Sequence, residues 1–595
     1  EYRGYDSAGM GVMSLDGGCD KCAQEIAFFK AIGKLENLAK KSEGFSSSGE
    51  GVAIGHTRWA THGAPSEQNA HPHVSMHGGV TLVHNGIIEN DRELREELLG
   101  EGFRFYSETD TEVAANYIEY CFDRAEGDPK QAIRRFMERA RGSYALAILF
   151  QGRTDEIWAV RKDSPMIIGR GEDGCCLASD VQAILKYSDS ACYIGNREIA
   201  RLTERGISFF DEKGRAIEKE MGRIEMDGRV AEKGIYPHFM LKEIHEQPAA
   251  VEETLRSMLR DGRISLSGIG ISDSALQKLR SVWIVACGSA FYAGTALQYG
   301  IEALAGILVR TELASEFRYR KPLLSSEDLV ILISQSGETA DTLAALRETK
   351  LRGASTLAIV NVPGSSIARE ADYVLYTLAG PEVSVATTKA YSAQLMAGYI
   401  LCLALARARV RLTRAEEERL TGALRELPEK ISLCLSLSDS LSGIAERCRD
   451  ARDVFFLGRG IDYAAGLEAA LKLKELSYIH AEAYAAGELK HGAISLIEEG
   501  VPVIGILSQP ELFEKMRSNM AEVKSRGGCL YALFMGKDRE LLSGTDGSIL
   551  LPETEPLFSA SLSVIPLQLL AYRVSVLRGL DVDRPRNLAK SVTVE

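Results

Sequence analysis

A short apolar run followed by a polar loop lies in the middle of the chain. Residues 329–333 are five consecutive apolar residues rich in β-branched side chains, which predicts a buried strand of a parallel sheet. Residues 334–339 then read Ser-Gln-Ser-Gly-Glu-Thr, and residues 340–352 have apolar positions at helical spacing. Free N–H groups at a helix start favour an anion, and the loop hydroxyls add donors. The pattern alone fits a phosphate-binding loop and an ordinary capped helix equally well.

This strand belongs to a repeat in the second half of the chain. Residues 281–294 and 453–466 both read as a buried strand, a glycine turn and a helix. The polar loop has a weaker copy within residues 503–511, which lacks the second Ser and the Gly and gains Pro510. Each copy is typical of a βαβ unit, so we predict two doubly wound parallel sheets. The glycine turns do not continue as G-x-G-x-x-G, and we therefore expect no dinucleotide cofactor.

The first part of the chain has a different pattern. Short alternating or apolar runs recur, with two helical patterns, residues 91–99 and 110–124, between the early runs. Many strands with few helices predict an α+β layered domain. Glycines and a proline within residues 220–242 indicate a linker. The predicted division is an α+β domain at 1–225, a linker at 226–248, two α/β domains at 249–430 and 431–580, and a tail at 581–595.

Composition narrows the class of protein. The 595 residues carry a net charge of −13 with no basic run, which argues against nucleic acid or an anionic membrane as a partner. The longest apolar run, residues 395–406, is too short for a bilayer and fits a buried core helix. Eleven scattered cysteines favour reduced thiols and a cytoplasmic protein. Cys19 and Cys22 form an isolated C-x-x-C, and the histidines within residues 56–84 lack partners at zinc-site spacing, so we expect no metal.

Three polar segments in the first domain, residues 55–63, 84–90 and 107–112, follow strands or precede helices, where loops often carry function. Arg58 has the fork geometry to bind a carboxylate, and Asp110 has the charge to bind an ammonium. Asn85 and the N–H of Gly86 have the donors for an oxyanion hole. Together they would hold an α-amino acid at both ends. Taken singly, Asn85-Gly86 is equally well a tight turn and Asp110 a helix cap.

Residues 463–480 predict a helix that is apolar on most sides and therefore buried. Lys472 and Glu475 share one face of it, and buried charges are costly unless they are paired or used. The pair is either a structural ion pair or a general base whose pKa is raised by burial. His491 lies in a polar loop, where an ordinary solvated histidine is the simpler interpretation. The tail has no amphipathic period and on its own predicts a disordered end.

The three polar segments of the first domain, residues 55–63, 84–90 and 107–112, resemble the class II glutamine amidotransferases, which have an N-terminal-nucleophile fold. The likeness is closest to the glutamine–fructose-6-phosphate aminotransferase (isomerising) family and covers the whole chain. It implies an oxyanion hole at Asn85 and Gly86 and an ammonia passage gated by Trp59. The implied glutamine contacts are Arg58, Trp59, Thr61, His62, Gly86 and Asp110. The family's nucleophile is a terminal Cys in a Cys-Gly-Ile-Val segment, which the printed sequence lacks, so we expect the chain as written to release no glutamate from glutamine.

The repeated half resembles paired sugar isomerase (SIS) domains, with a sugar phosphate held by the copy whose loop is intact. The resemblance implies that Glu475, with Lys472 beside it, moves a proton between C1 and C2 of the sugar. It implies that His491 opens the sugar ring from the neighbouring subunit and that Lys590 forms a Schiff base with the open ketose. The implied sugar-phosphate contacts are Ser289, Ser334, Gln335, Ser336, Thr339, Val385 and Ala589.

The resemblance therefore implies a cytoplasmic homodimer that makes glucosamine 6-phosphate from fructose 6-phosphate and glutamine nitrogen, without a metal or an organic cofactor. One alternative is a sugar-phosphate sensor built from SIS domains, which would need the loop but not Glu475, His491 and Lys590 together. The other is a different class II amidotransferase, such as one that uses phosphoribosyl pyrophosphate, which would not need the repeat.

Overall fold

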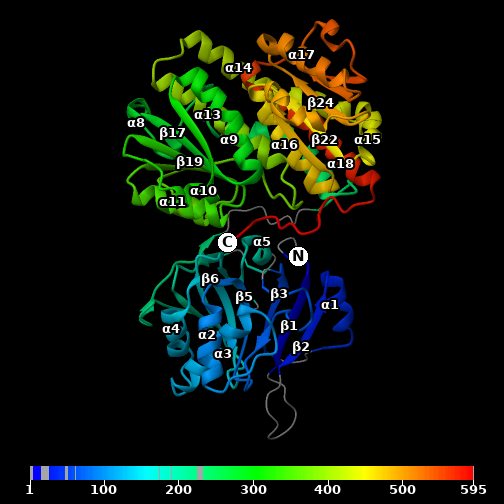
Figure 1. Cartoon of the computed structure of the whole chain (residues 1–595). Helices are drawn as coiled ribbons and strands as arrows, with labels where there is room; N and C mark the ends of the chain where they lie inside the picture. Colours follow the sequence, from blue (N-terminus) through cyan, green and yellow to red (C-terminus); the bar gives the residue numbers. More distant parts are fainter. Residues whose placement is uncertain are drawn as a thin grey trace. The chain divides into compact units, whose positions relative to one another are not determined.

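The chain forms two compact units in the computed structural model (Figure 1): Glu1–Val230 with Val592–Glu595, and Ala231–Ser591. The structure describes residues 4–14, 26–46, 51–60, 62–172, 174–185, 187–188, 190–223 and 232–593. Thr61, Cys19 and Cys22 lie outside the described residues.

A seven-stranded antiparallel sheet forms the centre of the first unit. In spatial order its strands are β13 (Ala216–Ile217), β12 (Gly206–Phe210), β11 (Ile199–Thr203), β7 (Ile157–Lys162), β6 (Gly142–Phe150), β5 (Val80–Ile88) and β4 (His73–Val74). The helices packed against it are α2 (Asp91–Gly100), α3 (Asp110–Asp123) and α4 (Pro129–Arg139). Leu82 and Leu146 face these helices, whereas Val83 and Ala147 face the opposite layer. The side chains alternate between faces because the strand period is two residues.

Two smaller sheets belong to the same unit. One has the order β2 (Ala27–Ile32), β1 (Ser7–Ser14) and β3 (Gly51–Arg58). The other has the order β14 (Gly222–Arg223), β10 (Ser190–Tyr193), β8 (Ile167–Gly171) and β9 (Gly174–Ala178). Met13 and Ile54 of the first pack on Val83 and Ala147 of the large sheet. The short helices α1 (Leu35–Lys41) and α5 (Val181–Ile184) complete the unit, which has the predicted α+β layered architecture.

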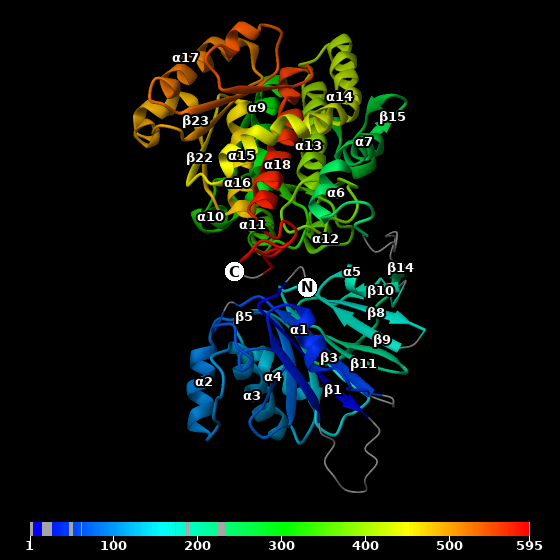
Figure 2. The ribbon, with the colours of Figure 1, turned by 90° about the vertical axis from the view of Figure 1, so that its right-hand side faces the viewer.

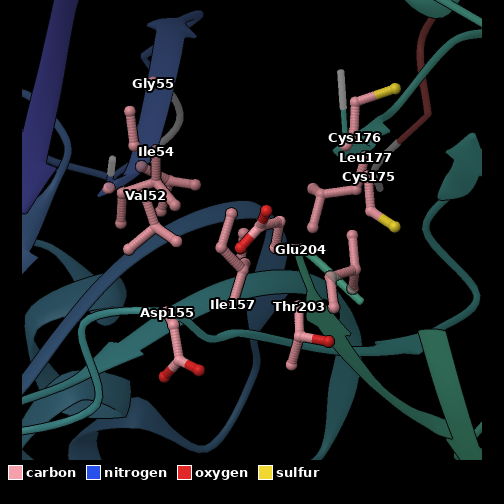
Figure 3. A pocket seen from close by; sticks show the side chains of 16 residues that line it. Val52, Ile54, Gly55, Asp155, Ile157, Cys175, Cys176, Leu177, Thr203 and Glu204 are labelled. Atoms are coloured by element: carbon pink, nitrogen blue, oxygen red, sulfur yellow. The ribbon is translucent and has the colours of Figure 1, made fainter. Parts of the chain in front are cut away.

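A cavity of about 440 Å³ lies between β3 and β9 (Figure 3). Val52 and Ile54 of β3 line it, as do Leu177 of β9 and Ile157 of β7. Each of β3 and β9 is the last strand of its own sheet, so two sheet edges meet at this cavity. Its lining includes none of the predicted glutamine contacts among the described residues.

The second unit contains two five-stranded parallel sheets with the same strand order. The first has β18 (Leu308–Leu313), β17 (Ser281–Ala286), β19 (Asp328–Ser334), β20 (Ser355–Val360) and β21 (Tyr373–Tyr376). The second has β23 (His480–Ala485), β22 (Asp453–Gly458), β24 (Pro502–Leu507), β25 (Cys529–Phe534) and β26 (Gly547–Leu550). The strands β17 and β22 are the two predicted starts of the repeat, and each pairs in parallel on both sides. The predicted pair of doubly wound sheets is confirmed.

One hydrophobic core joins the two sheets of this unit, because it includes residues of both β17 and β22. The helix α13 (Lys389–Ala408) packs on α9 (Gly288–Ala305), and α18 (Ala560–Leu577) packs on α16 (Ile461–Ser477), as Figure 2 shows. The helix α13 and residues 556–577 are long and apolar enough to cross a membrane, but 100% and 83% of their apolar windows are buried inside the protein. Both are therefore core helices, as predicted for residues 395–406.

The remaining elements of the second unit surround this core. The helices are α6 (Phe239–His245), α7 (Gln247–Ser257), α8 (Asp273–Lys278), α10 (Ala314–Arg320), α11 (Ala340–Leu351), α12 (Ser366–Glu370), α14 (Arg414–Leu435), α15 (Ser442–Arg449) and α17 (Phe513–Lys524). A two-stranded hairpin is formed by β15 (Leu259–Arg260) and β16 (Arg263–Ile264).

Candidate active sites

The loop of residues 334–339, called here the anion loop, connects β19 to the N-terminus of α11. The hydroxyls of Ser334 and Thr339 lie 3.0 Å apart, and Ser334 Oγ accepts a hydrogen bond from the N–H of Gly337 at 3.1 Å. Gly337 has a φ of +65°, and a Cβ there would lie 2.0 Å from the Ser365 hydroxyl, so the tight turn requires glycine. The loop thus gathers three hydroxyls at a helix N-terminus, the arrangement that suits a phosphate. Gln335 is half-buried within it and accepts a backbone hydrogen bond through its carbonyl.

The tail contacts this loop directly. The hydroxyls of Ser591 and Ser336 lie 2.9 Å apart, and the carbonyl of Asp583 accepts a hydrogen bond from the N–H of Val385 at 3.0 Å. The Asp583 carboxylate accepts the first N–H groups of α6 at 3.0 and 2.8 Å. Although residues 581–591 of the tail form no helix or strand, these contacts hold them on the second unit. Ala589 is half-buried beside Lys590 in this segment.

Lys590 forms an ion pair inside the second unit. Its Nζ lies 2.5 Å from Oε2 of Glu382, and the two side chains are 5% and 0% exposed. The other oxygen of Glu382 accepts hydrogen bonds from the N–H groups of Thr388 at 2.9 Å and Ala390 at 3.1 Å. Attraction to Lys590 and the hydrogen bonds outweigh burial and lower the pKa of Glu382. Glu382 was not among the predicted site residues, although it lies three residues before the predicted contact Val385.

The helix α16 carries a buried charge cluster. Lys472 is 1% exposed, and its Nζ lies 2.5 Å from Glu475 and 3.6 Å from Glu468. Burial raises the pKa of Glu468 to about 8, against the effect of Lys472. Glu475 is 21% exposed, so the desolvated carboxylate of this cluster is Glu468 and not the predicted Glu475. Ser289 is buried at the start of α9 beside Glu468, whose two carboxylate oxygens have no hydrogen-bond partner among the described residues.

His491, the remaining residue of the predicted sugar site, takes part in none of the contacts described above. It is exposed at the end of the short 3-10 helix Ala486–His491. The structure shows no hydrogen bond or ion pair to its ring from any described residue. The helix α16 itself begins two residues before its predicted start and ends at Ser477, because Tyr478 adopts a left-handed φ of 61° and β23 begins at His480.

The first unit brings together the predicted glutamine contacts that it describes. Arg58 ends β3 and is 4% exposed, and its guanidinium donates to the carbonyl of Gly63 at 3.0 Å and to that of His62. Burial lowers the pKa of Arg58, against the attraction of nearby Asp110. Asp110 begins α3, and its carboxylate accepts the N–H of Ile88 at 2.8 Å. Trp59 and His62 follow Arg58 by one and four residues, and both are half-buried.

The oxyanion-hole candidates lie on β5, held by a neighbour that the sequence analysis did not select. His56 Nε2 lies 2.7 Å from the side-chain oxygen of Asn85, which leaves the Asn85 amide nitrogen for another acceptor. Gly86 has a φ of +137°, and a Cβ would lie 2.1 Å from the carbonyl of Ser143, so no larger residue fits. The backbone at this position therefore requires glycine.

A cluster of histidines whose pKa values are lowered by burial lies next to this site. The rings of His56 and His71 stack with centroids 4.3 Å apart, and His73 Nε2 lies 3.0 Å from the hydroxyl of Thr109. Burial lowers the pKa of His73 to about 3 and that of His71 well below its usual value. His84 is also buried with a lowered pKa, 3.8 Å from Asp110. Within the described ranges no group of three His, Cys, Asp or Glu side chains could hold a metal ion.

Comparison with known proteins gives matches along the whole chain. Residues 275–404 and 448–578 match the SIS domain family, and residues 56–186 match the Glutamine amidotransferase domain family. Two relatives with the name glutamine–fructose-6-phosphate aminotransferase (isomerizing), from Clostridium tetani and Symbiobacterium thermophilum, are 48% and 49% identical over 596 and 597 residues. Each alignment covers 100% of this chain and 96% of the relative. The solved C-terminal domain of glucosamine-fructose-6-phosphate aminotransferase from Francisella tularensis is 40% identical, with a TM-score of 0.58, over 59% of this chain and 100% of that one.

Proposed function

Because the chain belongs to the glutamine–fructose-6-phosphate aminotransferase family, we propose that it transfers the amide nitrogen of glutamine to fructose 6-phosphate and isomerises the product to glucosamine 6-phosphate. The observation that carries the proposal is the contact of Ser591 with Ser336 of the anion loop, since it brings the tail to the loop. A lysine with nucleophilic chemistry and a phosphate-binding loop are then parts of one site. A protein that binds sugar phosphates without catalysis would not need this lysine.

In the sugar half, the anion loop holds the 6-phosphate through Ser334, Ser336 and Thr339, with Gln335 beside them. Ser289, the backbone of Val385 and Ala589 contact the sugar. Lys590 forms a Schiff base with the open ketose, and Glu475 then moves a proton between C1 and C2. The neighbouring Lys472, paired with Glu475 at 2.5 Å, keeps that carboxylate oriented on α16.

In the glutamine half, Arg58 binds the α-carboxylate and Asp110 the α-ammonium. Asn85 and the N–H of Gly86 stabilise the oxyanion, and His56 supports this role by holding the Asn85 amide. Trp59, Thr61 and His62 complete the glutamine contacts. No metal or organic cofactor takes part in either half of the proposed reaction.

The proposal includes a homodimer in the cytoplasm. His491 is exposed, which suits a side chain that acts in the site of the partner copy to open the sugar ring. All nine cysteines among the described residues are free thiols, as expected in a reducing compartment. Sedimentation at several protein concentrations tests the dimer. A mixture of the inactive variants His491→Ala and Lys590→Ala tests the shared site, because only a mixed dimer with a shared site regains activity.

Reductive trapping tests the chemistry of the sugar half. The protein is incubated with fructose 6-phosphate and sodium borohydride, digested, and the modified peptide is located by mass spectrometry. The proposal expects a hexitol phosphate adduct on Lys590 and none in Lys590→Arg. A sensor would bind the sugar phosphate without forming an adduct, and an adduct on another lysine would contradict the assigned role.

A further inference from the structure

The ion pair between Lys590 and Glu382 poses a chemical problem for the proposed Schiff base. An ammonium has no lone pair, so Lys590 must lose a proton before its nitrogen can attack a carbonyl. The pair is buried, with side chains that are 5% and 0% exposed, so bulk water is not in contact with most of it. The proton therefore needs an acceptor that is already in place.

Glu382 is positioned to be that acceptor. The N–H groups of Thr388 and Ala390, at the start of α13, hold its Oε1 at 2.9 and 3.1 Å. This backbone support fixes the carboxylate and leaves Oε2 directed at Lys590 Nζ, 2.5 Å away. One oxygen is thus anchored, and the other shares a hydrogen with the amine.

A second buried carboxyl group lies next to this pair. Glu243 of α6 is 2% exposed, and its Oε1 accepts the N–H groups of Val383 at 2.5 Å and Ser384 at 3.2 Å. Its Oε2 is buried without a hydrogen-bond partner. A buried charged oxygen without a partner is costly, which favours a proton on Glu243. Burial and the charge of Glu382 raise the pKa of Glu243 to about 8, against the effect of Lys590.

The surrounding charges define how this site titrates. Lys389 of α13 lies near Glu243, but its Nζ is paired with Glu246 at 2.7 Å. Lys472 of α16 feels the charge of Glu382 while it is paired with Glu475. Lys590 is consequently the cation that Glu382 neutralises by direct contact, and Glu243 is the neighbour that changes how strongly Glu382 holds a proton.

We propose that Glu382 is the catalytic base that removes the proton from Lys590, and that Glu243 is a positioning residue that sets the basicity of Glu382. This inference rests on the proposed Schiff-base role of Lys590. In the step, one N–H bond of the ammonium breaks and an O–H bond forms on Glu382. The free amine attacks C2 of the ketose to give a carbinolamine, and Glu382 returns the proton to the hydroxyl that leaves as water. One ammonium and one ketone thus give one iminium and one water, with both carboxyl groups restored.

The test measures the rate of borohydride trapping with fructose 6-phosphate as a function of pH in the full chain. Glu382→Gln keeps the size of the side chain but cannot take up the proton. Its trapping rate should fall about 100-fold at pH 7, in the usual range for losing a general base, and should recover as the pH approaches that of free lysine deprotonation. Glu243→Gln keeps an acceptor for the N–H groups of Val383 and Ser384. Its pH profile should shift to lower pH, and its trapping rate should fall less than that of Glu382→Gln.

Glu246→Gln is the matched control, because this residue contacts Lys389 and not Lys590. Its pH profile should coincide with that of the parent. Glu382→Asp keeps the base with one methylene less, and its rate should lie between those of parent and Glu382→Gln with the parent's profile shape. If Glu382→Gln does not fold, the comparison of Glu382→Asp with the parent still tests the inference.

The outcomes separate the inference from the function it rests on. A parent that is labelled on Lys590, together with a Glu382→Gln profile equal to the parent's, overturns the role of Glu382 and leaves the Schiff base intact. A Glu382→Asp profile shifted toward the pH of free lysine likewise overturns it. If the parent carries no label on Lys590, the Schiff base and the role of Glu382 both fail.

Discussion

The two α/β copies have the same strand order, yet the polar groups of their equivalent loops have different partners. In the first copy the anion loop meets Ser591 of the tail. In the second copy the loop after β24 is closed by its own side chains: Asp462 accepts the N–H of Ser508 at 2.9 Å and also its hydroxyl. The repeat places Ala290 at the position of Asp462, and its methyl group cannot accept a hydrogen bond. Equal folds thus differ in function through a few side chains at the loop.

The polar groups of the second loop bind one another, which leaves them unavailable to a ligand. In the second copy Gln509 Nε2 donates to Ser508 Oγ and Ser559 Oγ, both at 2.9 Å, so the loop donors and acceptors are satisfied internally. A carboxylate here takes the position that an external anion would need. The first copy keeps its hydroxyls for a ligand, and we expect that copy alone to bind the sugar phosphate.

The largest effect should come from Lys590 of the tail, the segment that meets the anion loop of the first copy. Lys590→Ala should abolish hexose 6-phosphate isomerisation, because the proposed Schiff base needs the Lys590 amine, while the protein folds and still binds the phosphate. Isomerisation assays with calorimetric titration of fructose 6-phosphate check both statements. Residual isomerisation near the parental rate would show that the tail is not catalytic.

Glu475→Gln should lower isomerisation by about 10²- to 10⁴-fold, the usual range for a lost general base. The control is Glu446→Gln on α15 in the second copy, whose carboxylate contacts only the exposed Arg449 among the interactions shown. Exchange of a C1 deuteron of fructose 6-phosphate with solvent measures the proton step directly. Parental exchange in Glu475→Gln would assign this step to another group, with buried Glu468 as the first candidate.

The two units should respond to pH with opposite signs. Burial, with Lys30 nearby, lowers the folded pKa of His73 to about 3 from 6.5, so this histidine contributes stability above pH 6.5 that is lost as the pH falls. The loss should reach about 2 kcal/mol of unfolding free energy between pH 6.5 and 5. Burial raises the pKa of Asp462 from 3.8 to about 7, so its contribution is present at low pH and is lost as the pH rises through 7.

Calorimetry across this pH range can separate the two contributions. The transition of the first unit should move down in temperature on acidification, and His73→Gln should flatten that dependence. Asp462→Asn should weaken the opposite trend in the second unit, to which buried Glu243 and Glu468 also contribute. Parallel shifts of the variants and the parent at every pH would contradict the assignment of these groups.

The smallest effect contrasts the two loops directly. Ser336→Ala should weaken fructose 6-phosphate binding by about 1–2 kcal/mol, because it removes a hydrogen bond to a charged group. Ser508→Ala in the second copy should leave the affinity unchanged, since its hydroxyl is bonded to Asp462. Equal losses in calorimetric titrations of the two variants would mean that both copies bind the sugar phosphate.

The local pattern of the chain was sufficient for the elements and their order. The apolar run of residues 329–333 lies within β19, and the repeat at residues 281–294 and 453–466 became equivalent strand–helix units. Side-chain periodicity reports which face of an element is buried, and buried parallel strands with glycine turns have few other folds available. The hydroxyls of the anion loop could also be selected from the sequence, because they lie within six consecutive residues.

Tertiary structure alone decided which distant groups meet and which charges are buried. Glu382 and Lys590 are separated by 208 positions, and no local pattern links them. The burial of Glu468 in place of Glu475 depends on how α9 packs against α16, which a helical wheel cannot show when most sides of the helix are apolar. Periodicity is a property of neighbours in sequence, whereas the pKa of a group and its partner depend on the packing of elements that are remote in the chain.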